Sequence, residues 1–134
     1  MTTATATKNA RTIIAASTSN AAGGTTRGTL DLRTAFGGLL TIKMINGATG
    51  PTVQGVANVL IAHNAGATPA AASAGADWKT IYQVGNGTVA NTVGEWSIPI
   101  EQSVMHVEVE IAGNTGQAVT CEAFMSELTS IAEV

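Results

Sequence analysis

The sequence has few charged residues, few aromatic residues and a single cysteine. Of its 134 residues only 11% are charged and 4% are aromatic, whereas ordinary soluble domains carry roughly 25% charged residues. Its surface must therefore be built largely from small neutral side chains, which Ala, Gly and Thr supply. Such a surface is easier to explain if partners cover part of it, and a monomer with a surface of Thr, Ser and Asn is the alternative.

The lone cysteine, Cys121, cannot form a disulfide within the chain. We interpret it as a small buried hydrophobic residue on a strand, because a catalytic thiol would need a nearby histidine. No stretch approaches the roughly 20 apolar residues of a membrane span, and the N-terminal sequence lacks an apolar core of signal-peptide length. We therefore expect synthesis in a reducing cytoplasm and no membrane partner.

The basic residues are too scattered for nucleic-acid binding. The formal net charge is -3, and only six residues are Lys or Arg. Binding to a phosphate backbone depends on a patch of such residues, and the sequence contains no run of them. Nucleic acid is therefore not expected as the main partner.

Alternating apolar and polar residues predict strands along most of the chain. Two motifs, Asn-Gly at Asn46 and Gly-Asn-Gly at Gly85, are typical of the turns that separate strands. About eight strands and no convincing helix predict an all-β fold, a single antiparallel β-sandwich or jelly roll. The predicted strands are residues 28–33, 39–45, 52–62, 78–84 and 95–100 and two arms within 104–125, with a further short strand or edge clamp at 11–17.

Residues 104–125 carry the clearest pattern, which we interpret as a hairpin. In the first arm Met105, Val107, Val109 and Ile111 are predicted to face the core together with Leu40, Ile42 and Met44, and in the second arm Val119, Cys121, Ala123 and Met125 alternate with polar residues. The connection contains Gly113 and Gly116, which tolerate the positive φ of a tight turn.

The remaining segments have less to bury. Residues 1–9 are predicted to be a flexible N-terminal arm that orders on a neighbour, and residues 10–134 a single β-sandwich domain. Residues 127–134 are interpreted as a short tail. The Ala-rich stretch 63–77 is expected to be an exposed loop, with a short helix over 69–74 as the alternative.

No catalytic constellation is found, so we expect neither enzyme activity nor a cofactor. His106, Glu108 and Glu110 project from one strand face, and this stripe is interpreted as solvated or partner-facing rather than as a metal site, which would need further ligands. Sugar-binding sandwiches use exposed aromatic side chains, and the candidates are Trp78, Tyr82 and Trp96. Core packing is the alternative for each of them.

Two segments carry a family resemblance: LDLRTAFGGLLTIKMINGATGPT at residues 30–52 and VMHVEVEIAGNTGQAVTCEA at residues 104–123, with DWKTIYQV between them. Together they resemble small structural proteins of tailed-bacteriophage virions. The resemblance implies a sandwich or jelly-roll domain that binds an assembled head as a capsid cement (decoration) protein.

The partners implied by this resemblance are the major capsid protein and copies of the chain itself in a homo-oligomer, and the implied location is the capsid surface of the virion. A tail or fibre component and a carbohydrate-binding module are the alternatives. Many weakly bound copies on a shell would add their affinities through avidity.

Overall fold

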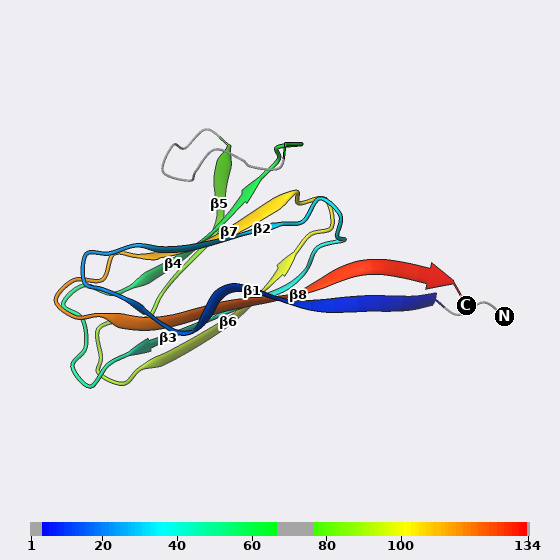
Figure 1. Cartoon of the computed structure of the whole chain (residues 1–134). Helices are drawn as coiled ribbons and strands as arrows, with labels where there is room; N and C mark the ends of the chain where they lie inside the picture. Colours follow the sequence, from blue (N-terminus) through cyan, green and yellow to red (C-terminus); the bar gives the residue numbers. More distant parts are fainter. Residues whose placement is uncertain (1–3, 67–76, 134) are drawn as a thin grey trace.

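The protein is a sandwich of two four-stranded antiparallel sheets, shown in Figure 1. The computed structural model describes residues 4–66 and 77–133. Sheet A has the strand order β1-β8-β3-β6 and sheet B the order β2-β7-β4-β5. The predicted all-β sandwich is confirmed. The strands are β1 (Ala4–Asn20), β2 (Thr26–Asp31), β3 (Gly38–Asn46), β4 (Val56–Ala62), β5 (Trp78–Gly85), β6 (Val93–Ile100), β7 (His106–Ala112) and β8 (Val119–Glu133).

The core lies between the two sheets and is built from the positions that alternate inward. Period-two alternation places every second side chain on one face of a strand, and burial of that face is the main stabilising contribution. The predicted inward residues of β3 and β8 are confirmed, since all are at most 2% exposed. They are Leu40, Ile42, Met44, Val119, Cys121, Ala123 and Met125.

The predicted hairpin of residues 104–125 is wrong. β7 pairs with β2 and β4 in sheet B, whereas β8 pairs with β1 and β3 in sheet A. The connection that contains Gly113 and Gly116 therefore crosses from one sheet to the other. A glycine-rich connection between two alternating strands has the same local chemistry in both arrangements, so the sequence did not distinguish them.

The predicted faces of β7 are correct on one side only. Val107, Val109 and Ile111 are completely buried, as expected, but Met105 precedes the strand and is 36% exposed. The opposite face, predicted to be wet, is covered, since His106 and Glu108 are 1% and 4% exposed. The reason is position, because β7 is an interior strand with neighbours on both sides. On its outer face Leu60 and Ala62 of β4 are the register partners of Glu108 and His106, and these two apolar residues cluster with Trp78.

The two ends of the chain also differ from expectation. Residues 4–9, predicted to be an arm that waits for a neighbour, belong to β1 and pair with β8 of the same chain, and the interpretation of residues 127–134 as a tail is wrong because β8 continues to Glu133. The flexibility of the arm stays a prediction. Ile13 and Ile14, expected in a short strand or edge clamp, lie in β1, which packs so closely on β2 that a Cβ on Gly28 would collide with the carbonyl oxygen of Ile13.

Two further boundaries were predicted less well. β4 begins at Val56 rather than at Thr52, and the preceding residues form an isolated bridge between Val53 and Thr115. The predicted loop 63–77, with its alternative helix, falls mostly on residues 67–76, which lie outside the described residues. Within the part of the chain that is described, no helix is long and apolar enough to cross a membrane.

Candidate interaction surfaces

A two-stranded ribbon projects from the sandwich and is the most prominent feature of its surface (Figure 1). We call residues 4–8 of β1 and residues 128–133 of β8 the terminal ribbon. Ala4 is the register partner of Glu133, and the pairing continues down to Lys8 opposite Leu128. β3 ends its pairing with β8 at Gly38 opposite Glu127, so the ribbon extends beyond the third strand. Residues 4–8 and 130–132 are all exposed, and only Leu128 and Thr129 at the root are half-buried, so the core does not cover the outer part of the ribbon.

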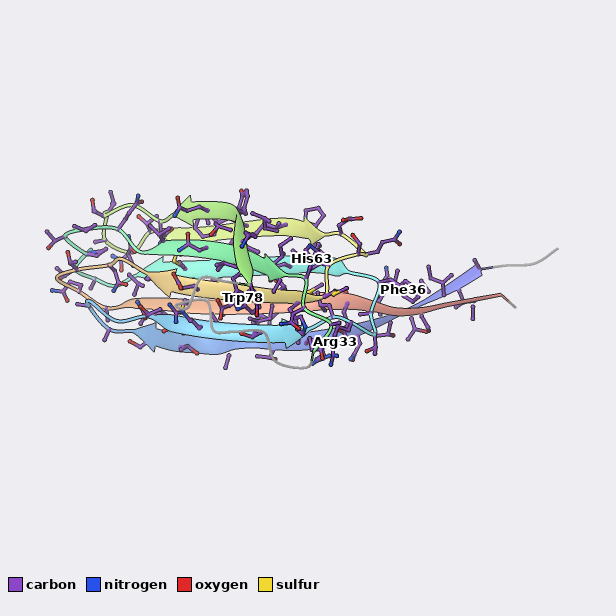
Figure 2. The ribbon with its side chains drawn as sticks, turned by 90° about the horizontal axis from the view of Figure 1, so that it is seen from above. Arg33, Phe36, His63 and Trp78 are labelled. Atoms are coloured by element: carbon purple, nitrogen blue, oxygen red, sulfur yellow. The ribbon has the colours of Figure 1, made fainter. Side chains whose placement is uncertain are left out.

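The root of the ribbon is anchored by backbone and charge contacts. The N–H of Phe36 donates to the carbonyl oxygen of Leu128 at 2.6 Å, and the N–H of Leu128 donates to the carbonyl oxygen of Gly37 at 2.9 Å. Arg11 of β1 donates to Glu127 of β8 at 3.0 Å, where the glutamate side chain is only 5% exposed. Phe36 itself is 46% exposed, and Figure 2 shows it beside the point where the ribbon leaves the sandwich.

The polar row of β7 forms a second candidate surface, on the outer face of sheet B. Nε2 of His106 lies 3.0 Å from the carbonyl oxygen of Asn64. Glu108 accepts a hydrogen bond from Thr29 at 3.2 Å, and Glu110 pairs with Arg27 at 2.7 Å. Removal from water raises the pKa of Glu108, while the bond from Thr29 opposes that shift. Each residue of the row thus has a polar partner, and His106 and Glu108 are buried rather than solvated.

This row does not form a metal centre with its neighbours. No group of three or more His, Cys, Asp or Glu side chains in the described ranges could hold an ion. Glu108 retains one buried carboxylate oxygen, Oε2, without a hydrogen-bond partner, which fits the raised pKa of that group. At the end of the row, Arg33 binds Asp31 at 2.8 Å and holds the pKa of that carboxyl at about 2.

A shallow hollow of about 420 Å³ lies across β8, β3 and β6 of sheet A. Register places Glu122, Lys43 and Glu95 in one row across the three strands, and Lys43 lies 3.7 Å from Glu95. Thr41 and Ser97 form the next row and also line the hollow. Both signs of charge are present in it, and the pair of Lys43 and Glu95 is solvated. An exposed ion pair of this kind contributes little stability.

The aromatic and thiol candidates are largely occupied by packing. Trp78 is 6% exposed and clusters with Leu60 and Ala62, and Trp96 packs against the main core. Tyr82, at 40% exposure, is the one of the three predicted sugar platforms that remains open. Cys121 is buried, as predicted, and burial raises the pKa of its thiol to about 11, so it carries no reactive thiolate at neutral pH.

The sequence reasoning missed the exposed apolar side chains on the ribbon and beside its root. Ile131 is 59% exposed and Phe36 is 46% exposed, and neither was singled out. A signal was available, because Leu128 and Ile131 are large apolar residues in a stretch interpreted as a tail. Their partner strand lies more than a hundred residues earlier, and such a pairing leaves no local mark.

Comparisons with known proteins support the fold alone. No protein-family model matches the sequence, and no curated protein matches it. Among solved structures, the K3 cleaved adhesin domain of Lys-gingipain from Porphyromonas gingivalis w83 is similar with a TM-score of 0.58 and 12% identity, over 81% of this chain and 71% of that chain. PirA is similar with a TM-score of 0.51 and 10% identity, over 89% of this chain and 92% of the PirA chain. Dimeric latent PorU from Porphyromonas gingivalis is similar with a TM-score of 0.52 and 12% identity, over 92% of this chain and 13% of the PorU chain.

Proposed function

We propose that this protein is a non-enzymatic virion structural protein, a capsid cement protein that binds and stabilises an assembled phage head. The observation that carries the proposal is the terminal ribbon, a projecting pair of strands whose residues are not held by the core of their own domain. The sequence resemblance to small structural proteins of virions indicates an assembled phage head as the structure to which such a ribbon would attach.

The energetics of the ribbon favour attachment to a neighbour. An isolated two-stranded ribbon is at best marginally stable in water, and three or more strands or a packed face are needed for independent stability. Fixing each backbone residue costs about 1 to 2 kcal/mol of conformational entropy, which exposed Ala and Thr side chains offset poorly. A subunit that pairs with a ribbon edge would supply the missing hydrogen bonds and hold two bodies of the assembly together.

The rest of the surface is consistent with a structural role. Only 11% of the residues are charged, and the polar groups of sheet B are largely paired with one another rather than gathered around an open cleft. A sugar-binding role would require exposed aromatic platforms, and the burial of Trp78 removes one of the three candidates.

Binding to particles that lack the protein tests the proposal. Deletion of residues 1–9 removes one strand of the ribbon, so we expect co-sedimentation with such particles to weaken strongly. The urea midpoint should change little, because residues 4–8 are exposed and add little to the core. Val89→Lys is the matched control, since this residue is 71% exposed and its loop packs against Asn46, at the other end of β3 from the ribbon root.

Three results would count against the proposal. Full-length protein that does not bind heads would exclude the cement role, and cryo-electron microscopy that places it on a tail or fibre would replace that role with the alternative. Specific retention on a glycan array without particle binding would favour a carbohydrate-binding module.

A further inference from the structure

The edges of the sandwich body are protected against pairing with another sheet. Natural sheets protect their edges with bulges, prolines or covering segments. β1 has register shifts on both sides of Ile14, and β5 has one opposite the step from Val59 to Leu60. β6 contains Pro99, which has no N–H to donate. β2 is approached by β1 so closely that Gly28 cannot carry a side chain. The terminal ribbon has one register shift of its own, between Thr7 and Lys8 of β1. Beyond that shift its pairing is regular, and β8 has no neighbouring strand on its other side among the described residues.

The free edge of β8 in the ribbon has a defined length. Both backbone groups of Leu128 are already bonded, its N–H to Gly37 and its carbonyl oxygen to Phe36. β3 ends its pairing at Glu127, so residues 129–133 of β8 have β1 on one side and, among the described residues, no strand on the other. Thr129 is the extra residue at the register shift between Thr7 and Lys8, so the regular part of this open edge is residues 130–133, and Ile131 lies within it. Ile131 is also the large apolar side chain that the ribbon exposes, at 59%.

We propose that two copies of this chain pair through these edges, with the two β8 strands antiparallel across a two-fold axis at Ile131. The inference rests on the proposed function in taking the ribbon as an attachment element, and it names the neighbour as a second copy. A two-fold contact is self-complementary, so one free edge is sufficient for both partners. The two ribbons then form a four-stranded sheet, which has the strand number that a lone ribbon lacks.

Side chains on the ribbon and at its root support this register. Residues directly opposite in an antiparallel pair have Cβ atoms about 4.5–5.5 Å apart, so Ile131 would pack on its own counterpart. The free end of one ribbon would lie beside the root of the other, where Phe36 is exposed (Figure 2). Within residues 129–132 no side chain is charged, so no like charges would face each other there.

Cysteine trapping tests the pairing directly. Ile131→Cys should form a covalent dimer under mild oxidation, because the two thiols would lie opposite each other across the axis. The native Cys121 is buried with a raised pKa and provides a silent background. Val89→Cys, exposed on the loop that packs against Asn46, is the matched control and should remain monomeric on non-reducing gels. Equal cross-linking of the two variants, or none in either, would overturn the proposal.

Analytical sedimentation of the wild-type chain and of a charged variant measures the strength of the dimer. The wild-type chain should sediment as a dimer at high concentration, and Ile131→Lys should weaken the dimer at least about tenfold because two ammonium groups would then face each other. Thr5→Cys reports on the other edge of the ribbon, and cross-linking at Thr5 in place of Ile131 would refute the assignment to β8.

The outcomes for the interface and for the cement role can be separated. If Ile131→Cys cross-links but the protein does not bind heads, the dimer is right and the cement role is wrong. If heads bind the chain, while Ile131→Cys does not cross-link either in solution or on particles, the ribbon contacts the shell itself and the dimer is wrong.

Discussion

Replacing Asn114 by alanine should destabilise the fold far more than its loop position would suggest. Asn114 follows β7 in the crossing between the sheets, and its side chain is completely buried. Its amide nitrogen donates to the carbonyl oxygens of Asn20 at 3.1 Å and Gln117 at 3.0 Å, and its amide oxygen accepts from the side chain of Asn20 at 2.6 Å. These hydrogen bonds connect the end of β1 to the loop that links β7 with β8.

The magnitude follows from the groups that are left without partners. A buried hydrogen bond contributes about 1 kcal/mol net, and a buried polar group that loses its partner costs about 1–3 kcal/mol. Asn114→Ala removes three short bonds, while the amide of Asn20 keeps a bond to Gly24 at 3.1 Å. We expect a loss of about 3 kcal/mol in the free energy of unfolding, a large fraction of the roughly 5–15 kcal/mol of an ordinary domain.

Urea denaturation of the wild-type protein and four variants, Asn114→Ala, Gln117→Ala, Asn20→Ala and the double variant, checks this expectation. Gln117→Ala is the control, because this side chain is exposed in the same loop and should change stability by less than about 0.5 kcal/mol. The double variant Asn20→Ala with Asn114→Ala should cost less than the sum of the single variants, because the two side chains bond each other. A loss for Asn114→Ala no larger than that of Gln117→Ala would refute the account.

Three further outcomes can be measured on the isolated protein. Val109→Ala should lose about 1–3 kcal/mol in urea denaturation because Val109 is 0% exposed, whereas Val89→Ala should be neutral. The pKa of Glu108 is raised, so the folded state binds the proton of this carboxyl more tightly than the unfolded state does. The free energy of unfolding should therefore fall as the pH rises from about 4.5 through the pKa of the folded state. Glu108→Gln should abolish this fall. A parallel pH dependence in both proteins would contradict this. Arg33→Ala should raise the pKa of Asp31 from about 2 toward 3.8 in an NMR titration, and an unchanged value would show that the guanidinium is not the cause.

Local pattern was sufficient to predict the fold class and most of the core. The inward positions of β3, such as Leu40 and Met44, follow from period-two alternation, which depends only on neighbouring residues. Which strands pair depends instead on contacts between residues far apart in sequence. The glycines at 113 and 116 predicted a hairpin, although the two strands belong to different sheets.

The candidate surfaces were harder to predict for the same reason. His106 and Glu108 were expected in water because they are polar, and they are buried because β7 is an interior strand flanked by Leu60 and Ala62. The ribbon was missed because neither of its strands has a strong pattern alone. Buried asparagines such as Asn46 and Asn86 also escaped prediction, since an Asn-Gly pair indicates a turn but not the side-chain bond at 3.2 Å that links two turns.

The pairing of β1 with β8 sets the order in which the molecule can be completed. Asn9 and Glu127, which share a hydrogen bond at the root of the ribbon, are 118 residues apart. On a ribosome β1 is synthesised before β8, so it lacks this partner while strands β2 to β7 are made, and sheet A cannot be completed before β8 is present. Contacts of such long sequence separation slow folding, because loop-closure entropy must be overcome before they form. The edge that we propose for dimerisation lies on β8, so it can form only after strands β1 to β7 have been synthesised.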